Sequence, residues 1–284
     1  MSCNEEMVEF WNGQLGLQWV HHQELLDAQL AEFGRRSRAL LGPLAGVRVL
    51  DVGCGCGASA LELARAVGSR GRVVGIDISA PMLSRARARA RALGLSATVS
   101  FMEADAQIAE LGAGVFDAVY SRFGVMFFAR PIAAFRNLSR TLKAGGLIAF
   151  VCWRRAERNP WFTETAEAAS AHLTLPEELP PRAPGPFGLA ERSWIEEVLS
   201  RAGFAELEIQ SSDVPMDLSA KLEDLVELQL SIGPVGRALR ETAVSLKTRG
   251  QVERAVREAL GTFLTPRGYV APASVWLVQA RCPR

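Results

Sequence analysis

The feature that most constrains the fold of this chain is its stretch from residue 47 to residue 57. It starts as an apolar strand that ends in Asp51 and continues with glycine at alternate positions, Gly53, Gly55 and Gly57. Glycine permits positive φ and lets a ligand approach bare backbone. The first turn of the apolar helix that follows leaves N–H groups free to bind that ligand. The stretch therefore predicts a strand, a glycine turn and a helix that form a site for a nucleotide-like ligand.

The glycines alone do not identify the ligand. Gly53, Gly55 and Ala58 satisfy the dinucleotide pattern G-x-G-x-x-G/A. Gly57 adds a second pattern, G-x-G-x-G, with Asp51 two residues ahead of the first glycine. A nicotinamide dinucleotide and another adenosine ligand are both compatible with this turn.

Strand and helix patterns alternate regularly after the glycine turn. Strands are predicted at 72–77, 98–102, 116–121 and 147–153, with a helix at 132–142. Ser79 is expected to cap the helix after the second strand, which carries Pro81 in its first turn and ends before Gly94. A turn is expected at Gly145 and Gly146. This alternation predicts a doubly wound, mainly parallel sheet.

The second half of the chain interrupts this alternation twice. A helix at 161–173 and a proline-rich loop come first, and a capping box at 193–196 is expected to open the next helix. A strand at 206–214, helices across 219–264 and a last strand at 274–280 follow. The chain is therefore expected to divide into an N-terminal helical lid (1–42), a ligand-binding core (43–153), a cap insertion (154–190), two segments that complete the core sheet (191–214 and 271–284) and a helical cap insertion (215–270).

Three acids fall at the carboxyl ends of predicted strands. Asp51 ends the first, Asp77 ends the second and Asp105 follows the third. In a doubly wound sheet these ends line one crevice, where ligands bind. Asp77 can accept hydrogen bonds from a ribose diol, and Asp105 can accept one from an adenine amino group. NAD usually needs only the second of these acids, so the set favours another adenosine ligand.

Composition argues against several classes of partner. The formal net charge is +1, with 32 basic and 31 acidic residues, and a nucleic-acid footprint needs a basic face. The five cysteines show no repeated spacing, so neither disulfides nor a zinc site are expected. No signal peptide and no membrane span are recognised. We expect a cytoplasmic protein with a small-molecule partner and no nucleic acid or membrane; its oligomeric state is left open.

The motifs, taken together and in order, resemble those of the class I S-adenosylmethionine (SAM) methyltransferases. The matching segments are 49–57, 75–79, 103–106, 116–121 and 142–146. The pattern is similar to the small-molecule branch that includes the ubiquinone/menaquinone-type enzymes. Further segments at 121–128, 150–154 and 159–161 resemble a bacterial secondary-metabolism subgroup.

This resemblance implies an α/β fold: a seven-stranded, mainly parallel, Rossmann-like sheet whose last strand, 274–280, is antiparallel, with a helical cap. It implies SAM as cofactor and S-adenosylhomocysteine as product. The implied cofactor-binding residues are Asp51, Gly53, Gly55, Gly57, Asp77, Ile78, Met82, Asp105, Ala106 and Ser121. Among them, Asp51 is expected near the amino group of SAM, Asp77 at the ribose hydroxyls and Ser121 facing the methyl centre.

An apolar acceptor pocket is expected beside the cofactor, because a sulfonium methyl needs mainly an in-line approach and a dry cavity. The residues expected to line it are Trp19, Phe123, Met126, Phe127, Phe128, Trp153 and Phe187. His22 is the candidate general base because it lies in the expected lid. No metal is expected at His21 and His22, with Glu24 nearby, since neighbours on a helix point about 100° apart.

The expected function is therefore methyl transfer from SAM to the oxygen or carbon of a small, largely apolar molecule. Two alternatives stay open. The protein could bind SAM without methyl transfer, as a cyclase or a binding module, and no residue separates this from transfer. A nicotinamide-dependent oxidoreductase is the other, against which the absence of a Tyr-x-x-x-Lys motif counts.

Overall fold

The computed structural model describes residues 4–218 and 221–283, so Cys3 and part of the helical block expected at 219–264 lie outside the described residues. The helices are α1 (Glu5–Asn12), α2 (Gln14–His21), α3 (Gln23–Ala39), α4 (Ala58–Val67), α5 (Ala80–Ala92), α6 (Pro131–Thr141), α7 (Pro160–Ser170), α8 (Arg192–Arg201), α9 (Leu222–Ser231), α10 (Gly233–Glu241) and α11 (Leu246–Gly261), with short 3-10 turns η1 (Val125–Phe127) and η2 (Ala156–Arg158). The strands are β1 (Arg48–Val52), β2 (Arg72–Asp77), β3 (Val99–Glu103), β4 (Phe116–Arg122), β5 (Leu142–Trp153), β6 (Ala205–Asp217), β7 (Leu264–Thr265) and β8 (Gly268–Arg281).

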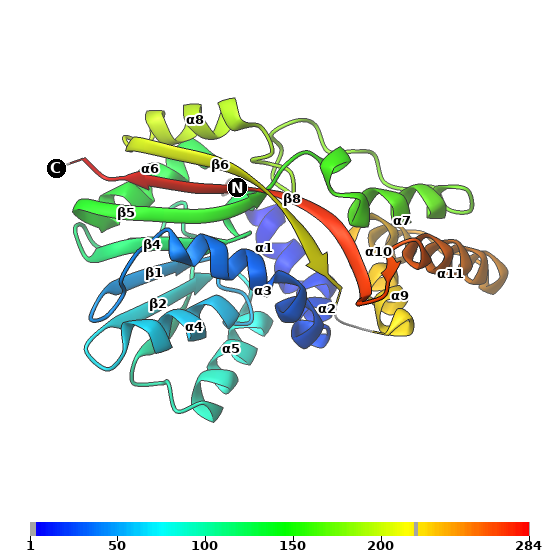
Figure 1. Ribbon diagram of the computed structural model, residues 1–284, viewed down its shortest axis with the longest axis horizontal. Coiled ribbons are helices and arrows are strands. Elements are labelled where there is room, and N and C mark those ends of the chain that lie inside the picture. The colour runs from blue at the N-terminus through cyan, green and yellow to red at the C-terminus, as the bar shows by residue number, and fades with distance from the viewer. Residues whose placement is uncertain (1–3, 219–220, 284) are drawn as a thin grey trace.

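The strands form one sheet in the order β3-β2-β1-β4-β5-β8-β6, and the short β7 pairs with β8 alone. The first five are parallel to one another. β8 runs antiparallel to both of its neighbours, β5 and β6, and Figure 1 shows it between them. The predicted mainly parallel sheet, with an antiparallel last strand, is confirmed.

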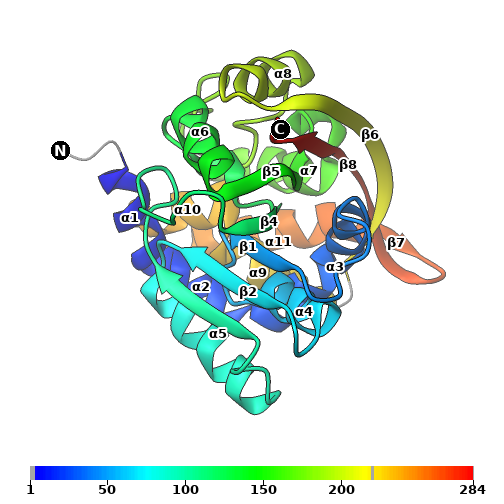
Figure 2. The same ribbon diagram turned by 90° about the vertical axis from the view of Figure 1, so that its left-hand side faces the viewer.

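Helices cover both faces of this sheet (Figure 2). Alternate strand residues point to opposite faces, so Val49 packs with buried residues of α4 and α5. Its neighbour Leu50 packs with buried residues of α6 and α8, among them Leu138 and Val198. In the described part of the chain, no helix is both long and apolar enough to span a bilayer.

The far end of the molecule carries α7, α9, α10 and α11 together (Figure 1). The buried residues of α11 are Val252, Val256 and Leu260, one helical stripe. These helices come from the two segments that interrupt the alternation of strands and helices. In Figure 1 the helices α1 and α2 lie between the sheet and this group of helices, and the second half of α3 packs on the sheet, where Phe33 is fully buried.

The turn predicted at Gly145 and Gly146 is part of strand β5 instead. Gly145 has a φ of 75°, and the pairing of β4 with β5 shifts register between Phe116 and Ala118. Gly145 N donates to Cys282 O at 3.1 Å, and Cys282 N donates to Gly146 O at 2.9 Å. The strand therefore begins earlier than predicted because the end of the chain's last strand pairs with this bulge.

The predicted cap of α5 by the Ser79 side chain is wrong. Ser79 Oγ donates to Trp11 O at 2.7 Å, and Ala80 N donates to Asn12 Oδ1 at 2.9 Å. Asn12 Nδ2 also donates to Ile78 O at 2.8 Å. The helix is thus capped from the junction of α1 and α2, which a local sequence pattern does not reveal.

The predicted capping box at 193–196 is also wrong. The helix α8 already begins at Arg192, and its N-cap is Glu191, whose side chain caps no backbone N–H. Glu191 instead forms ion pairs with Arg155 at 3.0 Å and with Arg182 at 3.3 Å. The acid therefore joins this loop to the segment after β5.

Candidate functional site

The glycine turn after β1 has the backbone that its sequence predicts. Gly53, Gly55 and Gly57 have φ values of 66°, 52° and 84°, a region that L side chains rarely adopt. A Cβ on Gly53 would lie 2.6 Å from the Cα of Gly124. A Cβ on Gly57 would lie 2.9 Å from the Cβ of Ala86 in α5. The turn is therefore packed between the sheet and α5, and Gly57 lies off the cavity wall described below.

Asp77 holds the glycine turn to the end of β2. Its Oδ2 accepts a hydrogen bond from Gly55 N at 2.7 Å, and its Oδ1 accepts one from Ser79 N at 2.9 Å. Burial raises the pKa of this carboxyl, against the backbone hydrogen bonds that lower it. A carboxylate has about four lone-pair sites, so Asp77 keeps acceptor capacity for a further ligand.

Asp51 is fully buried at the end of β1. Its Oδ2 accepts a hydrogen bond from Ser59 Oγ at 2.6 Å, whereas its Oδ1 has no partner. Burial raises the pKa of Asp51 to about 7. A buried oxygen without a partner is costly. This atom would suit a cationic or N–H donor, but Asp51 is absent from the wall of the cavity described below, which its neighbours Val52 and Gly53 line.

The remaining predicted adenosine contacts share one wall of a cavity. Asp77, Ile78, Met82, Asp105 and Ala106 all line it. Asp105 Oδ1 accepts a hydrogen bond from the backbone N–H two residues on at 2.9 Å, which closes a short turn. The structure therefore brings together residues from the ends of β2 and β3 and from the start of α5.

Ser121 does not face this cavity, contrary to expectation. Only 1% of its surface is exposed, and it is absent from the cavity wall. Its Oγ donates to Val52 O at 2.7 Å and accepts from Gly124 N at 3.2 Å. Ser121 therefore ties the ends of β1 and β4 together and fixes the turn that follows.

The cavity has a volume of about 1040 Å³, at the upper end of the range for ligand pockets. Its wall includes the ends of β1, β2 and β4 and residues of the segments 1–42, 154–190 and 215–270. All seven predicted pocket residues line it: Trp19, Phe123, Met126, Phe127, Phe128, Trp153 and Phe187.

Aromatic rings form much of this wall. The rings of Phe123 and Trp153 stack with centroids 4.2 Å apart. Phe123 has a φ of 58°, a strained value for an aromatic residue. Trp11, which was not among the predicted pocket residues, lies 5.1 Å from Phe127 and 5.7 Å from Trp19 between ring centroids. The N-terminal helices therefore bring two tryptophans to the cavity.

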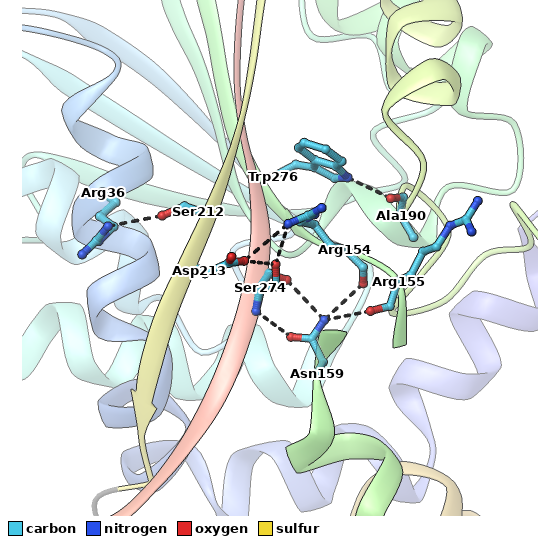
Figure 3. Close-up of polar contacts among 9 residues, drawn as sticks. All are labelled: Arg36, Arg154, Arg155, Asn159, Ala190, Ser212, Asp213, Ser274 and Trp276. Atoms are coloured by element: carbon cyan, nitrogen blue, oxygen red, sulfur yellow. Dashed lines mark hydrogen bonds and ion pairs between the residues drawn. The ribbon is translucent and has the colours of Figure 1, made fainter. Parts of the chain in front are cut away.

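Asn159 anchors the segment that leads from β5 to α7 (Figure 3). It is fully buried, and its Nδ2 donates to Arg154 O, Arg155 O and Ser274 O, each at 3.2 Å. Its Oδ1 accepts from Ser274 N at 2.9 Å and from Trp161 Nε1 at 3.3 Å. These bonds fix Trp161, another residue of the cavity wall, relative to β8.

A charged network occupies the wall near the glycine turn. Asp27 of α3 pairs with Arg89 at 2.8 Å and with Arg122 at 3.4 Å. Gln23 Nε2 donates to Asp27 Oδ2 at 2.6 Å, and Arg89 Nη1 donates to Cys56 O at 2.7 Å. Arg122, at the end of β4, is therefore engaged by a carboxylate of the N-terminal segment.

His22, the candidate general base, is not on the cavity wall. It is 8% exposed, and burial, followed by the neighbouring His21, lowers its pKa. The acid near these histidines is Glu227 of α9, 3.3 Å from His21 Nε2, whereas Glu24 pairs with Arg85 at 3.7 Å. The structure gives the predicted base no access to an acceptor in the cavity.

The sheet order, the glycine turn and the acids at the strand ends define a Rossmann-like protein of the class I methyltransferase type. Residues 49–146 match the family described as a methyltransferase domain. The match extends from β1 into the first part of β5.

Relatives share a similar portion of the chain. The aklanonic acid methyltransferase DauC of Streptomyces sp. (strain C5) is 35% identical over 117 residues, covering 41% of this chain and 53% of that protein. A ubiquinone/menaquinone biosynthesis C-methyltransferase UbiE of Pseudomonas paraeruginosa is 38% identical over 107 residues, covering 38% and 42%. The nocamycin O-methyltransferase of Saccharothrix syringae is 38% identical over 128 residues, covering 44% and 45%. The chain thus spans about half the length of the curated relatives it matches.

Solved structures match over more of the chain. The YcgJ protein of Bacillus subtilis has a TM-score of 0.56 at 17% identity, covering 90% of this chain and 98% of its own. The [4+2]-cyclase SpnF has a TM-score of 0.52 at 22% identity, covering 88% and 80%. At these identities the likeness establishes the fold alone, and the fold is shared by a cyclase.

Proposed function

We propose that the protein is a methyltransferase that moves a methyl group from SAM to a small, largely apolar acceptor and releases S-adenosylhomocysteine. One observation carries this proposal. A single cavity joins the wall of Asp77, Asp105 and the glycine turn to an aromatic wall that includes Phe123 and Trp153. The names of the relatives, which act on small molecules, support the same reading.

The residues present fit SAM. Asp51 Oδ1 is a buried acceptor without a partner; it would suit the amino group of the methionine part only if the turn at Gly53 moves and opens it to the cavity, whose wall does not include Asp51. Asp77 keeps lone pairs for the ribose hydroxyls, while Met82 and Ala106 offer apolar contact to the adenine. When bound, SAM would supply a methyl group that its sulfonium already activates. We therefore assign these residues, with Gly53 and Gly55, to cofactor binding.

The contribution of the chain to the reaction is positioning and exclusion of water. The aromatic wall suits a cationic sulfonium, since ring faces attract cations. His22 lies off the wall, and no other histidine of the described residues lines the cavity. We therefore propose that no histidine acts as base, so that the acceptor must be acidic enough to react without one, such as a phenol, a quinol or a stabilised carbon acid.

We also propose that 1–42, 154–190 and 215–270 act as the lid and caps of the core. Residues of all three line the cavity: Trp11 and Trp19 from the first, Phe187 from the second and Leu225 from the third. Because α3 packs on the sheet with Phe33 fully buried, the movable part of the lid would be α1 and α2.

Two other functions are compatible with this fold. The cyclase SpnF supports the reading that the protein binds SAM without methyl transfer, since it has the same fold. A nicotinamide oxidoreductase would use the same turn but needs no acid at the position of Asp105. The two alternatives differ from the proposal in ligand or in turnover, so both can be tested directly.

Calorimetry and turnover together test the proposal. Wild-type protein should bind SAM, and Asp77→Ala should weaken binding by at least about tenfold, because charged hydrogen bonds contribute about 1.5–3 kcal/mol. Asp117→Ala is the matched control, since that acid pairs with Lys143 at the opposite end of its strand. Incubation with methyl-labelled SAM and host extract should yield a labelled small product. Binding without a labelled product would favour the cyclase or binding module, and binding of NAD in place of SAM would favour the oxidoreductase.

A further inference from the structure

His21, His22 and Glu227 come together where the N-terminal helices meet α9. One ring nitrogen of each histidine and one carboxylate oxygen of Glu227 lie within 4.8 Å of one another. Imidazole and carboxylate are among the side-chain groups that bind zinc and related transition metals. The cluster joins segments 206 residues apart in the sequence, so it was not visible as a motif.

The break between α2 and α3 allows two adjacent histidines to share one site. His21 ends α2, and His22 lies between the helices with φ −91° and ψ 16°. The two rings therefore do not diverge as neighbours inside a helix would. Their centroids are 4.6 Å apart, at an interplanar angle of 78°.

These three side chains keep nitrogen and oxygen atoms that could bind a metal ion. His21 Nε2 and Glu227 Oε1 are 3.3 Å apart, and both side chains are exposed, at 65% and 61%. In the described residues, no arginine or lysine pairs with Glu227. His22 is buried, and its Nε2 has no hydrogen-bond partner. A surface ion pair alone contributes little and does not account for the buried imidazole beside it.

We propose that His21, His22 and Glu227 form a binding site for Zn²⁺. Ligand atoms about 2.1 Å from a tetrahedral zinc ion lie about 3.4 Å apart, which the His21–Glu227 distance of 3.3 Å already matches. The two exposed side chains are free to close on the fixed His22. Three protein ligands leave the fourth position to water.

The site lies where a bound ion would link α2 to α9. None of the three ligands is on the cavity wall, but Trp19 of α2 and Leu228 of α9 are. A bound ion would join the two segments that carry these residues, outside the space where an acceptor would react. The inference is therefore independent of the proposed methyl transfer.

Titration of tag-free, chelator-stripped protein with Zn²⁺ tests the site. We expect one Zn²⁺ per chain and a Tm that rises by roughly 5 °C at about a hundred times Kd. His21→Ala and Glu227→Gln change exposed side chains and should fold like the wild type. Each should weaken Zn²⁺ binding by at least about tenfold, the lower bound for losing even an outer-shell partner, and abolish the rise in Tm. His172→Ala, at an exposed histidine elsewhere, is the matched control and should leave both unchanged.

Two results would overturn the proposal. One is the absence of Zn²⁺ binding to wild-type protein at micromolar concentration. The other is equal Zn²⁺ affinity in the wild type, His21→Ala and Glu227→Gln, which would assign the metal to other surface groups. Far-UV circular dichroism of each variant separates a lost ligand from a lost fold.

Discussion

At the scale of single residues, two polar side chains at strand ends have different roles. Asp77 lines the cavity and keeps lone pairs for a ligand, whereas Ser121 uses its hydroxyl to hold backbone. The motifs placed both residues at the edge of the sheet, and that placement is correct. The Ser121 side chain turns away from the cavity because it bonds Val52 O and Gly124 N, and a linear pattern does not reveal these contacts.

The buried Asp51 makes stability depend on pH. Its pKa is raised to about 7 in the folded protein, above the value of an unfolded aspartate, so the folded state holds an extra proton between these values. Its contribution to stability is present at acid pH and is lost as pH rises to about 7. The free energy of unfolding in urea should therefore fall between pH 5 and pH 8 more steeply in the wild type than in Asp51→Asn.

The control for this prediction is Asp117→Asn, at an acid that pairs with Lys143 on the surface. It should keep the wild-type dependence on pH. Equal slopes in the wild type and Asp51→Asn would mean that Asp51 is already ionised, and solvated, in the folded protein.

At the scale of helices and strands, the sequence predicted the parallel core well because each strand and helix there has its own periodic pattern. The predictions that were wrong concern places where a contact with a residue distant in the sequence decides the local structure. Ser79 does not cap α5, because Asn12 from another helix does. His22 was assigned to the cavity because it lies in the lid, but the break between α2 and α3 turns it toward Glu227. The Asn12 contact and the Glu227 cluster have no signature in a single sequence.

Asn12 should hold the lid against the loop that follows Asp77. Its side chain bonds Ile78 O and Ala80 N across the contact and Val8 O within α1, so Asn12→Ala removes both hydrogen bonds between lid and loop, each contributing about 1 kcal/mol. We expect affinity for SAM to fall by roughly five- to thirtyfold, measured by calorimetry. The fold should stay intact, because α1 and α2 bury few large side chains.

Gln14→Ala provides the comparison, since it changes an exposed residue at the start of the adjacent helix α2. Its SAM affinity should equal that of the wild type. If both variants bind SAM like the wild type, the contact between lid and loop has no part in holding the cofactor.

At the scale of the whole molecule, three segments far apart in sequence enclose one apolar cavity of about 1040 Å³. All seven predicted pocket residues line it, because aromatic side chains next to strand ends have few other places to be buried. The volume of the cavity and the full set of residues that line it were not predictable, since they depend on how α7, α9 and α10 pack against one another.

This cavity predicts the class of acceptor. A largely apolar wall that includes several aromatic rings should accept phenols, quinols, indoles or terpenoids and reject tRNA and protein tails. Because the candidate zinc site lies off the wall, methyl transfer itself should proceed in EDTA. An acceptor screen by mass spectrometry, run with and without EDTA, measures both. Activity confined to tRNA or a protein tail, or complete loss of transfer in EDTA with an intact fold, would contradict this account of the cavity.

The position of β8 in the sheet determines when the sheet can be completed during translation of the chain. β6 pairs with no strand of the sheet other than β8, which lies between it and β5. During synthesis, β6 must therefore wait for residues 268–281 to leave the ribosome, while β1 to β5 can already pair. Until then the open side of β5 offers unpaired N–H and C=O groups to any extended chain nearby. A nascent chain of this protein is thus most exposed to mispairing just before its sheet is completed, and a chaperone that covers strand edges would act in that interval.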